Sequence, residues 1–301
     1  MPRPRPLDIP LLAARLRQLR EEWRGAPLSS DPLEFPHRYR SDADRELVAF
    51  LASSLAFGRV ASIRAILERL LALLGPRPSR FLESWNGEPL EALSGSVHRW
   101  VRGDDLAALL RALASARREH GSLEALFASG DDGRTDTTAA LTSFLDDLRS
   151  RAGSDSRAVR FLLPRPEEGG ACKRAHLFLR WMVRDTPPDL GLWRSGRLTP
   201  ARLLLPMDTH VHRISRYLGL TQRPTADLQA ARQATAVLAL IDPADPVSFD
   251  WALSRLGILM ECVRDVDRSH CERCAVAPVC RMARKATRRG AAKGAVTSAP
   301  C

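Results

Sequence analysis

Four cysteines near the C-terminal end of the chain have a spacing that suits a metal centre. Cys262, Cys271, Cys274 and Cys280 are separated by eight, two and five residues. The pair separated by two residues can present two thiolates from one tight turn, and four thiolates can hold either a tetrahedral zinc ion or a [4Fe–4S] cluster. The spacing therefore predicts one metal site made by all four cysteines and leaves the identity of the metal open.

The N-terminal sequence favours a reducing compartment, in which clustered cysteines bind metal rather than form disulfides. Residues 1–6 lead into no apolar stretch typical of a signal peptide, and the chain has no apolar run long enough to span a membrane. We therefore expect a soluble cytoplasmic protein with no membrane partner, in which disulfides are rare. Cys172 is expected to be a small buried residue and Cys301 a free thiol.

The positive charge of the chain is concentrated in two segments. The formal net charge is +11. Residues 281–301 contain six basic and no acidic side chains, residues 155–223 contain thirteen basic and six acidic ones, and the remainder of the chain has a charge of −2. A basic surplus confined to two segments predicts a polyanionic partner such as nucleic acid. The alternative is an arginine-rich composition without a binding role.

The elements that position these residues are predicted to be helices. Leu, Ala and Arg are common while Val and Ile are sparse, and apolar residues recur at helical spacing along most of the chain. A capping box at Ser41 predicts a helix start, and a short helix is expected after Thr199. The predicted fold class is all-α, with helices over residues 11–23, 41–57, 61–74, 90–101, 104–119, 136–150, 172–184, 209–218, 226–241 and 247–262.

Residues 207–214, Met-Asp-Thr-His-Val-His-Arg-Ile, open a predicted helix about fifty residues before Cys262. This segment resembles the Val-Asp-Thr-His-x-x-Arg-Val segment of the helix-hairpin-helix DNA glycosylases related to endonuclease III. In that superfamily a four-cysteine motif follows at a similar distance and binds a [4Fe–4S] cluster. The last three cysteines here match its spacing, and the first interval is two residues longer. Residues 171–184 also resemble DUF2400, a bacterial family of unknown function related to the same superfamily.

The resemblance implies a fold with two lobes and favours a [4Fe–4S] cluster over zinc. Residues 26–208 would form a barrel-like helical domain with a variant helix-hairpin-helix. Residues 1–25 and 209–280 would form the iron–sulfur domain, and residues 281–301 a basic disordered tail. The implied protein is a monomer that binds double-stranded, damaged DNA in the bacterial nucleoid.

Two residues take catalytic roles in this resemblance. Asp208 corresponds to the carboxylate that stabilises positive charge on deoxyribose during base release, and the alternative is that Asp208 only caps its helix. Lys173 falls where the lysine nucleophile of the bifunctional glycosylases would lie, and the alternative is a solvated lysine that contacts phosphate. The hairpin departs from the superfamily pattern, since it is longer and carries Glu167 and Glu168.

Further residues are expected to contact DNA. The hairpin glycines would expose backbone N–H groups to a phosphate, and Phe57 either inserts into the duplex or is buried. The predicted DNA-contacting residues are Gly169, Gly170, Arg174, Arg59, Arg213 and Arg268.

The sequence therefore predicts a base-excision repair glycosylase, with AP-lyase activity if Lys173 is the nucleophile. Two alternatives stay open. One is a nucleic-acid-binding protein that kept the fold without the chemistry, which would explain the altered hairpin. The other is a nucleic-acid adaptor stabilised by zinc.

Overall fold

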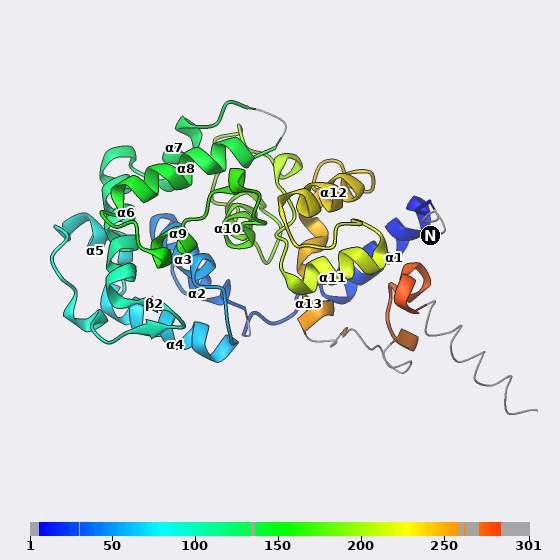
Figure 1. The fold of residues 1–301 in the computed structure, drawn as a ribbon, viewed down its shortest axis with the longest axis horizontal. Helices are drawn as coiled ribbons and strands as arrows, with labels where there is room; N and C mark the ends of the chain where they lie inside the picture. The colour runs from blue at the N-terminus through cyan, green and yellow to red at the C-terminus, as the bar shows by residue number, and fades with distance from the viewer. Residues whose placement is uncertain (1–5, 30, 134–135, 259–261, 263–270, 284–301) are drawn as a thin grey trace, which may run out of the picture. The chain divides into compact units, whose positions relative to one another are not determined.

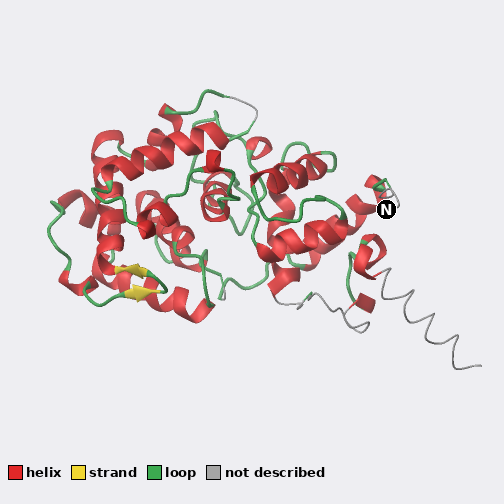
Figure 2. Ribbon diagram, in the orientation of Figure 1, coloured by secondary structure: helices red, strands yellow, loops and turns green. Residues whose placement is uncertain are grey.

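The computed structural model describes residues 6–29, 31–133, 136–258, 262 and 271–283 of this chain. Helices make up most of the described residues, and the prediction of an all-α protein is confirmed apart from one two-stranded hairpin (Figures 1 and 2). The chain divides into two compact units. Unit 1 comprises Met1–Ala26 and Leu205–Cys301, and unit 2 comprises Pro27–Leu204.

Unit 2 is built around α3 and α6. Helix α3 packs against α2, α5 and α10, while α6 packs against α5, α7, α8 and α9. The elements of unit 2 are α2 Glu34–His37, α3 Asp42–Ser54, α4 Val60–Leu74, α5 Pro78–Ser84, η1 Glu91–Leu93, β1 Val97–His98, β2 Val101–Arg102, α6 Gly103–His120, α7 Leu123–Ser129, α8 Thr138–Arg151, α9 Arg157–Leu162, η2 Pro166–Glu168, α10 Lys173–Val183 and η3 Pro200–Arg202.

The centre of α3 is surrounded on all sides by apolar side chains. Residues 47–52 of this helix are all buried, which fits the absence of a polar stripe in this part of the sequence. The ring of Phe50 packs edge-on against Phe178 of α10, with 5.0 Å between ring centroids, and also contacts Phe144 of α8 at 6.0 Å. Contacts of this kind stabilise a core beyond the burial of apolar area alone. They hold α10, which begins with Lys173, against the middle of unit 2.

A buried carboxylate joins three segments of unit 2. Glu46 of α3 accepts hydrogen bonds from the backbone N–H groups of Leu123 and Glu124, both at 3.0 Å, and from Nε1 of Trp193 at 2.7 Å. Burial raises the pKa of Glu46, and these three donors oppose the rise. Because the two backbone donors open α7, Glu46 satisfies N–H groups that have no partner within that helix.

Unit 1 packs two helices, α1 and α11, against α13, and α12 packs against the turn η4. A Cβ atom at Gly257 of α13 would lie 2.7 Å from Cβ of His210 in α11, so the absence of a side chain at this position permits the close contact. The described elements of unit 1 are α1 Ile9–Glu22, α11 Thr209–Leu218, α12 Leu228–Ala239, η4 Pro246–Phe249, α13 Asp250–Ile258 and η5 Ala277–Val279.

The prediction of a helix over residues 90–101 is wrong. Strands β1 and β2 pair there as an antiparallel hairpin, in which Val97 lies opposite Arg102 and His98 lies opposite Val101 (Figure 2). The β-branched Val97 and Val101 favour extended backbone, and Arg99 and Trp100 form the two-residue turn. Within the described residues, no helix is long and apolar enough to cross a membrane.

Candidate functional site

Asp208 lies at the start of α11 and caps this helix. Its Oδ1 atom accepts hydrogen bonds from the backbone N–H groups of His210 at 2.8 Å and Val211 at 2.7 Å. These N–H groups belong to the first turn and have no acceptor within the helix, so an aspartate at this position stabilises the helix. Oδ2 has no hydrogen-bond partner among the described residues, and the side chain is half-buried. Asp208 therefore has the capping role while one carboxylate oxygen remains available.

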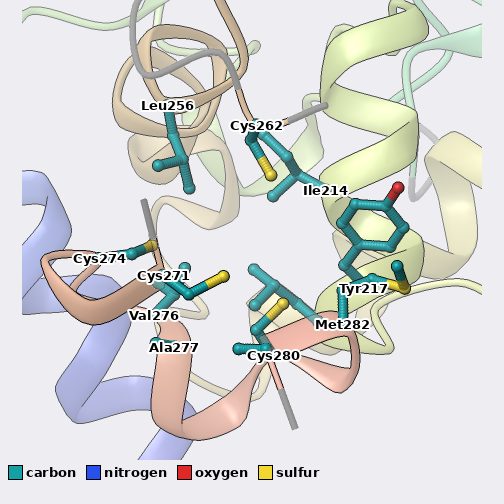
Figure 3. Close-up of a pocket in the computed structure, with 12 residues that line it drawn as sticks. Ile214, Tyr217, Leu256, Cys262, Cys271, Cys274, Val276, Ala277, Cys280 and Met282 are labelled. Carbon is teal, nitrogen blue, oxygen red and sulfur yellow. The ribbon is translucent and has the colours of Figure 1, made fainter. Parts of the chain in front are cut away.

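All four cysteines of the motif line one cavity of unit 1. Figure 3 shows the sulfur atoms of Cys262, Cys271 and Cys280 pointing into the space between α11 and the C-terminal segment, with Cys274 beside Cys271. Cys280 is buried, and the other three are half-buried. The cavity has a volume of about 40 Å³ and is otherwise walled by Ile214, Tyr217, Leu218, Leu256, Val276, Ala277, Met282 and Ala283.

Successive backbone turns bring three of the cysteines to this cavity. The N–H of Cys274 donates to the carbonyl of Cys271 at 3.2 Å, and the N–H of Cys280 donates to the carbonyl of Ala277 at 3.1 Å. The backbone N–H groups of Val276 and Ala277 also donate to the sulfur of Cys274. Hydrogen bonds of this kind stabilise a thiolate, and they are one of the means by which a protein adjusts a thiolate-bound metal group.

The cavity disfavours four unbound thiolates. Burial and the neighbouring cysteine sulfurs raise the pKa of Cys262 to about 11, and Arg213 opposes this rise. The pKa of Cys274 is raised for the same reasons. A bound cation reverses this balance, because a coordinating thiol is deprotonated.

The donor set fits a soft metal group. Four thiols and no carboxylate line the cavity, and thiolate ligands select zinc and iron–sulfur clusters. Within the described part of the chain, no three His, Cys, Asp or Glu side chains are gathered as they would be around a single metal ion. The cysteines instead surround a cavity larger than one water-sized site.

Lys173 is the first residue of α10 in unit 2, and the segment before it turns twice. After α9 the chain forms the short 3₁₀ turn η2, and Gly169 ends this turn in the left-handed region with φ 86°. Cys172 is also left-handed, with φ 42°, and burial raises the pKa of its thiol to about 11. Gly169 and Gly170 are exposed and Lys173 is half-buried. The segment therefore joins two helices by an exposed, glycine-containing loop.

The structure does not support Arg174 as a DNA contact. Its guanidinium is buried and donates to the backbone carbonyl of Ser54 at 2.6 Å and to that of Phe161. These carbonyls lie in the last turns of α3 and α9. A cation there stabilises carbonyl groups that have no partner within their helix. Burial lowers the pKa of Arg174 to about 10. Arg174 therefore joins two helix ends, because it lies on the inner face of α10.

The other predicted DNA contacts lie in different settings. Arg59 is exposed at the N-cap of α4. Arg213 is half-buried, and its Nη2 atom donates to Nδ1 of His210 at 3.2 Å. Arg268 lies outside the described residues.

Part of the basic surplus in residues 155–223 is internal. Arg180 and Arg184 are buried with Asp189, and Arg180 Nη2 lies 3.0 Å from Asp189 Oδ1. With Arg174, three basic side chains of this segment are directed into unit 2. The sequence therefore overstates the surface charge that this segment offers to a polyanion.

One exposed group was missed at the sequence level. Trp100 is 44% exposed at the hairpin tip, and its ring lies 5.6 Å from that of Phe57 and 5.0 Å from that of Phe161. Phe57, for which burial and insertion were both open, is half-buried. The signal that would have found Trp100 is the presence of a β-branched residue, Val97 or Val101, on each side of a short turn.

The comparisons with known proteins identify the family. Neither a curated protein nor a solved structure matches the chain. Residues 31–259 match DUF2400, which is described as a protein family of unknown function. The match covers unit 2 from residue 31 onward and continues into unit 1 past Asp208. It stops before Cys262, so the four cysteines lie beyond it. Because most of the chain is matched, this protein belongs to the DUF2400 family.

Proposed function

We propose that this protein is a DNA glycosylase that releases a damaged base, with Asp208 as the carboxylate that stabilises the reacting sugar. The observation that carries the proposal is the position of α11. Asp208 caps the first turn of this helix, and its Oδ2 is available. The other end of the helix contributes Ile214, Tyr217 and Leu218 to the wall of the cysteine cavity. The helix thus joins the aspartate motif and the cysteine motif, the two features that carry the resemblance to the helix-hairpin-helix glycosylases.

The chemistry requires a fixed carboxylate. The bond between C1′ of deoxyribose and the base nitrogen breaks, its electron pair leaves with the base, and positive charge develops on the sugar. A carboxylate held beside the sugar stabilises this state electrostatically, and C1′ then accepts an electron pair from water. The two backbone N–H groups that bind Oδ1 fix the Asp208 side chain, so that it need not reorganise during the reaction.

Lys173 is the proposed nucleophile of an accompanying AP-lyase step. A neutral amine can replace water as the group that attacks C1′, which gives a Schiff base and then loss of the 3′ phosphate by elimination. Lys173 is half-buried at the start of α10 and has no ion-pair partner among the described residues. Lys173 lies in unit 2 and Asp208 in unit 1, and each role is tested by its own substitution.

The four cysteines are proposed to hold a [4Fe–4S] cluster, with zinc as the alternative. The cluster would act as a structural group, because its ligands join the C-terminal segment to α11 and α13 through one shared cavity. A bound metal group contributes its binding free energy to folding wherever the ligands come together only in the folded state. Cys262, Cys271, Cys274 and Cys280 would therefore stabilise the helix that begins with Asp208.

A panel of duplexes tests this function. Each duplex carries one damaged base, and purified full-length protein is incubated with each in excess under single-turnover conditions, with and without borohydride. Base release from at least one lesion is expected, and borohydride should trap a covalent complex that the Lys173→Gln variant does not form. Base release without trapping would remove Lys173 as nucleophile and leave a glycosylase without lyase activity. The absence of base release from every lesion would contradict the proposed enzyme.

A second candidate is a DNA-binding protein of this fold that has no catalytic activity. This candidate would explain the altered helix-hairpin-helix loop, in which Glu167 and Glu168 are exposed beside Gly169 and would repel the phosphate that the glycosylases bind there. Selective binding to damaged duplex with no base release in the same panel would support this candidate over the enzyme.

A further inference from the structure

The hairpin formed by strands β1 and β2 in unit 2 carries an exposed apolar surface. Three of the five large apolar side chains that are exposed in the described part of the chain gather where α4 packs against β1. Val60 is 43% exposed, Val97 is 61% exposed and Trp100 is 44% exposed. Single exposed apolar residues are common, but a local group of them marks a surface that binds something.

The aromatic rings under this surface are held in place by one another. Phe57 lies 4.9 Å from Phe161, and Trp100 lies 5.0 Å from Phe161, both with edge-to-face geometry. The buried guanidinium of Arg174 lies 3.9 Å from the centroid of the Phe161 ring. These contacts fix the orientation of Trp100, so a planar ligand would bind to it without ordering a free side chain.

The tip of the hairpin is also strained. Arg99 has φ 59°, a left-handed conformation that glycine or asparagine usually takes in such turns. Its guanidinium lies 5.2 Å from the centroid of the Trp100 ring. A non-glycine residue in this unfavourable backbone conformation, beside an exposed tryptophan, points to a role beyond folding.

Positive charge surrounds the rings. Arg59, Arg99 and Arg102 are exposed, and none of the three has an ion-pair partner among the described residues. The loop before α4 and the hairpin tip touch, since a Cβ atom at Gly58 would lie 3.2 Å from Cδ of Arg99. Exposed aromatic rings beside unpaired arginines suit a nucleic-acid strand, whose bases stack and whose phosphates are anionic.

We infer that Trp100 forms a stacking platform for an unpaired base of DNA, with Arg59 and Arg99 on the adjacent phosphates. A base stacked inside a duplex has both faces covered, so this surface selects DNA in which one base is displaced or unopposed. A protein partner would suit the apolar part of the surface but would leave the three arginines without counter-charges. The inference deepens the proposed function, because it names the feature of damaged DNA that the protein recognises.

The test measures the affinity of the full-length protein for two duplexes of equal length, one fully paired and one with a single unopposed base. Wild type should prefer the second. Trp100→Ala should lose about 5- to 150-fold of affinity for it, the range expected for one stacked base. Trp100→Phe should keep most of the preference, whereas Trp100→Leu, which keeps apolar bulk without a flat ring, should lose it.

Matched variants separate stacking from charge and from folding. Arg99→Gln should weaken binding to both duplexes equally and reduce the salt dependence, because it removes a phosphate contact. If Trp100→Ala is unstable, the comparison of the Leu and Phe variants still shows whether a flat ring at this position is required. Equal preference in the Leu and Phe variants, or unchanged DNA binding in Trp100→Ala, would overturn the inference and favour another partner for this surface.

The outcome is independent of catalysis. Selective binding that depends on Trp100, with no base release from any lesion, would contradict only the glycosylase. Base release that Trp100 substitutions leave unchanged, with unchanged affinity, would contradict only the stacking platform.

Discussion

At the scale of single residues, Asp208 caps a helix and has a proposed catalytic role, and a pair of substitutions can separate the two. Its Oδ1 caps α11, while Oδ2 has no partner among the described residues. Asparagine keeps an oxygen for the cap but carries no charge, whereas alanine removes both. A comparison of the two variants therefore distinguishes loss of the helix cap from loss of the carboxylate charge.

Asp208→Ala should lower the free energy of unfolding by about 1 kcal/mol, because an N-cap side chain typically contributes about 0.5–2 kcal/mol. Asp208→Asn should unfold at nearly the same denaturant concentration as wild type. Chemical denaturation followed by circular dichroism measures both. A loss in the Asn variant as large as that in the Ala variant would show that the charge, rather than the cap, stabilises this helix start.

The cysteines give a second prediction at this scale. Full-length protein purified without oxygen from iron-replete cells should be brown and contain about four irons per chain. Cys271→Ser should lose the metal and the colour, while Cys172→Ser should keep both, because Cys172 lies in unit 2 and does not line the cavity. Metal analysis and visible absorption provide the readout. One zinc per chain and no iron would establish the zinc alternative.

Residue types and spacing revealed some of these positions and hid others. Short motifs in the sequence located the four cysteines that line one cavity and the aspartate that caps α11. Arg174 was placed wrongly, since sequence does not show that an arginine in the first turn of a helix lies on its buried face. Trp100 was missed because its exposure depends on a strand pairing that the helical interpretation of residues 90–101 excluded.

At the scale of elements, the contact between α11 and α13 depends on one glycine. Gly257→Ala should lower the free energy of unfolding by about 1–3 kcal/mol, because the added Cβ would lie 2.7 Å from Cβ of His210. Alanine alone would favour the helix, so any loss reports the contact. Gly170→Ala is the control, as its added Cβ would meet only Cys172 Sγ at 4.0 Å. A Gly257→Ala variant as stable as wild type would contradict this packing.

An ion pair fixes the connection between α10 and the end of unit 2. Asp131, just after α7, accepts two hydrogen bonds from Arg202, at 2.6 and 2.7 Å, and Arg202 lowers the pKa of Asp131. A lowered carboxyl pKa stabilises the fold above the unfolded value of 3.8, and this contribution is lost as the pH falls through the folded value.

Asp131→Asn should therefore cost about 2 kcal/mol of unfolding free energy at neutral pH. The difference in unfolding free energy between the variant and wild type should shrink as the pH falls below the pKa of an ordinary aspartate. Denaturation at several pH values measures the trend. A difference that stays constant down to strongly acidic pH would mean that the two side chains stabilise the fold by packing rather than by their charges.

Long helices were predictable and short ones were not. The apolar period located α1, α4, α6, α8, α10, α11 and α12 to within a few residues. Helices α2, α5, α7 and α9 have seven residues or fewer, too few for a period to emerge, and tertiary contacts such as Glu46 with the start of α7 support them.

At the scale of the whole molecule, the charge of +11 should govern association with DNA. Binding should weaken steeply as salt rises, because contacts with phosphate release counterions. Deletion of residues 284–301, which hold five basic side chains and no acidic one, should weaken binding and flatten the salt dependence while single-turnover base release is retained. Affinity that does not change with salt would count against a nucleic-acid partner.

The catalytic role of Asp208 is tested by the single-turnover rate of base release by the wild type and by Asp208→Asn on one lesion-containing duplex. Asp208→Asn should bind the duplex as well as wild type does. It should release the base about 100- to 1,000-fold more slowly, the loss typical when one electrostatic stabiliser of a transition state is removed. Equal rates in the two proteins would contradict the role of Asp208, and the proposed site with it.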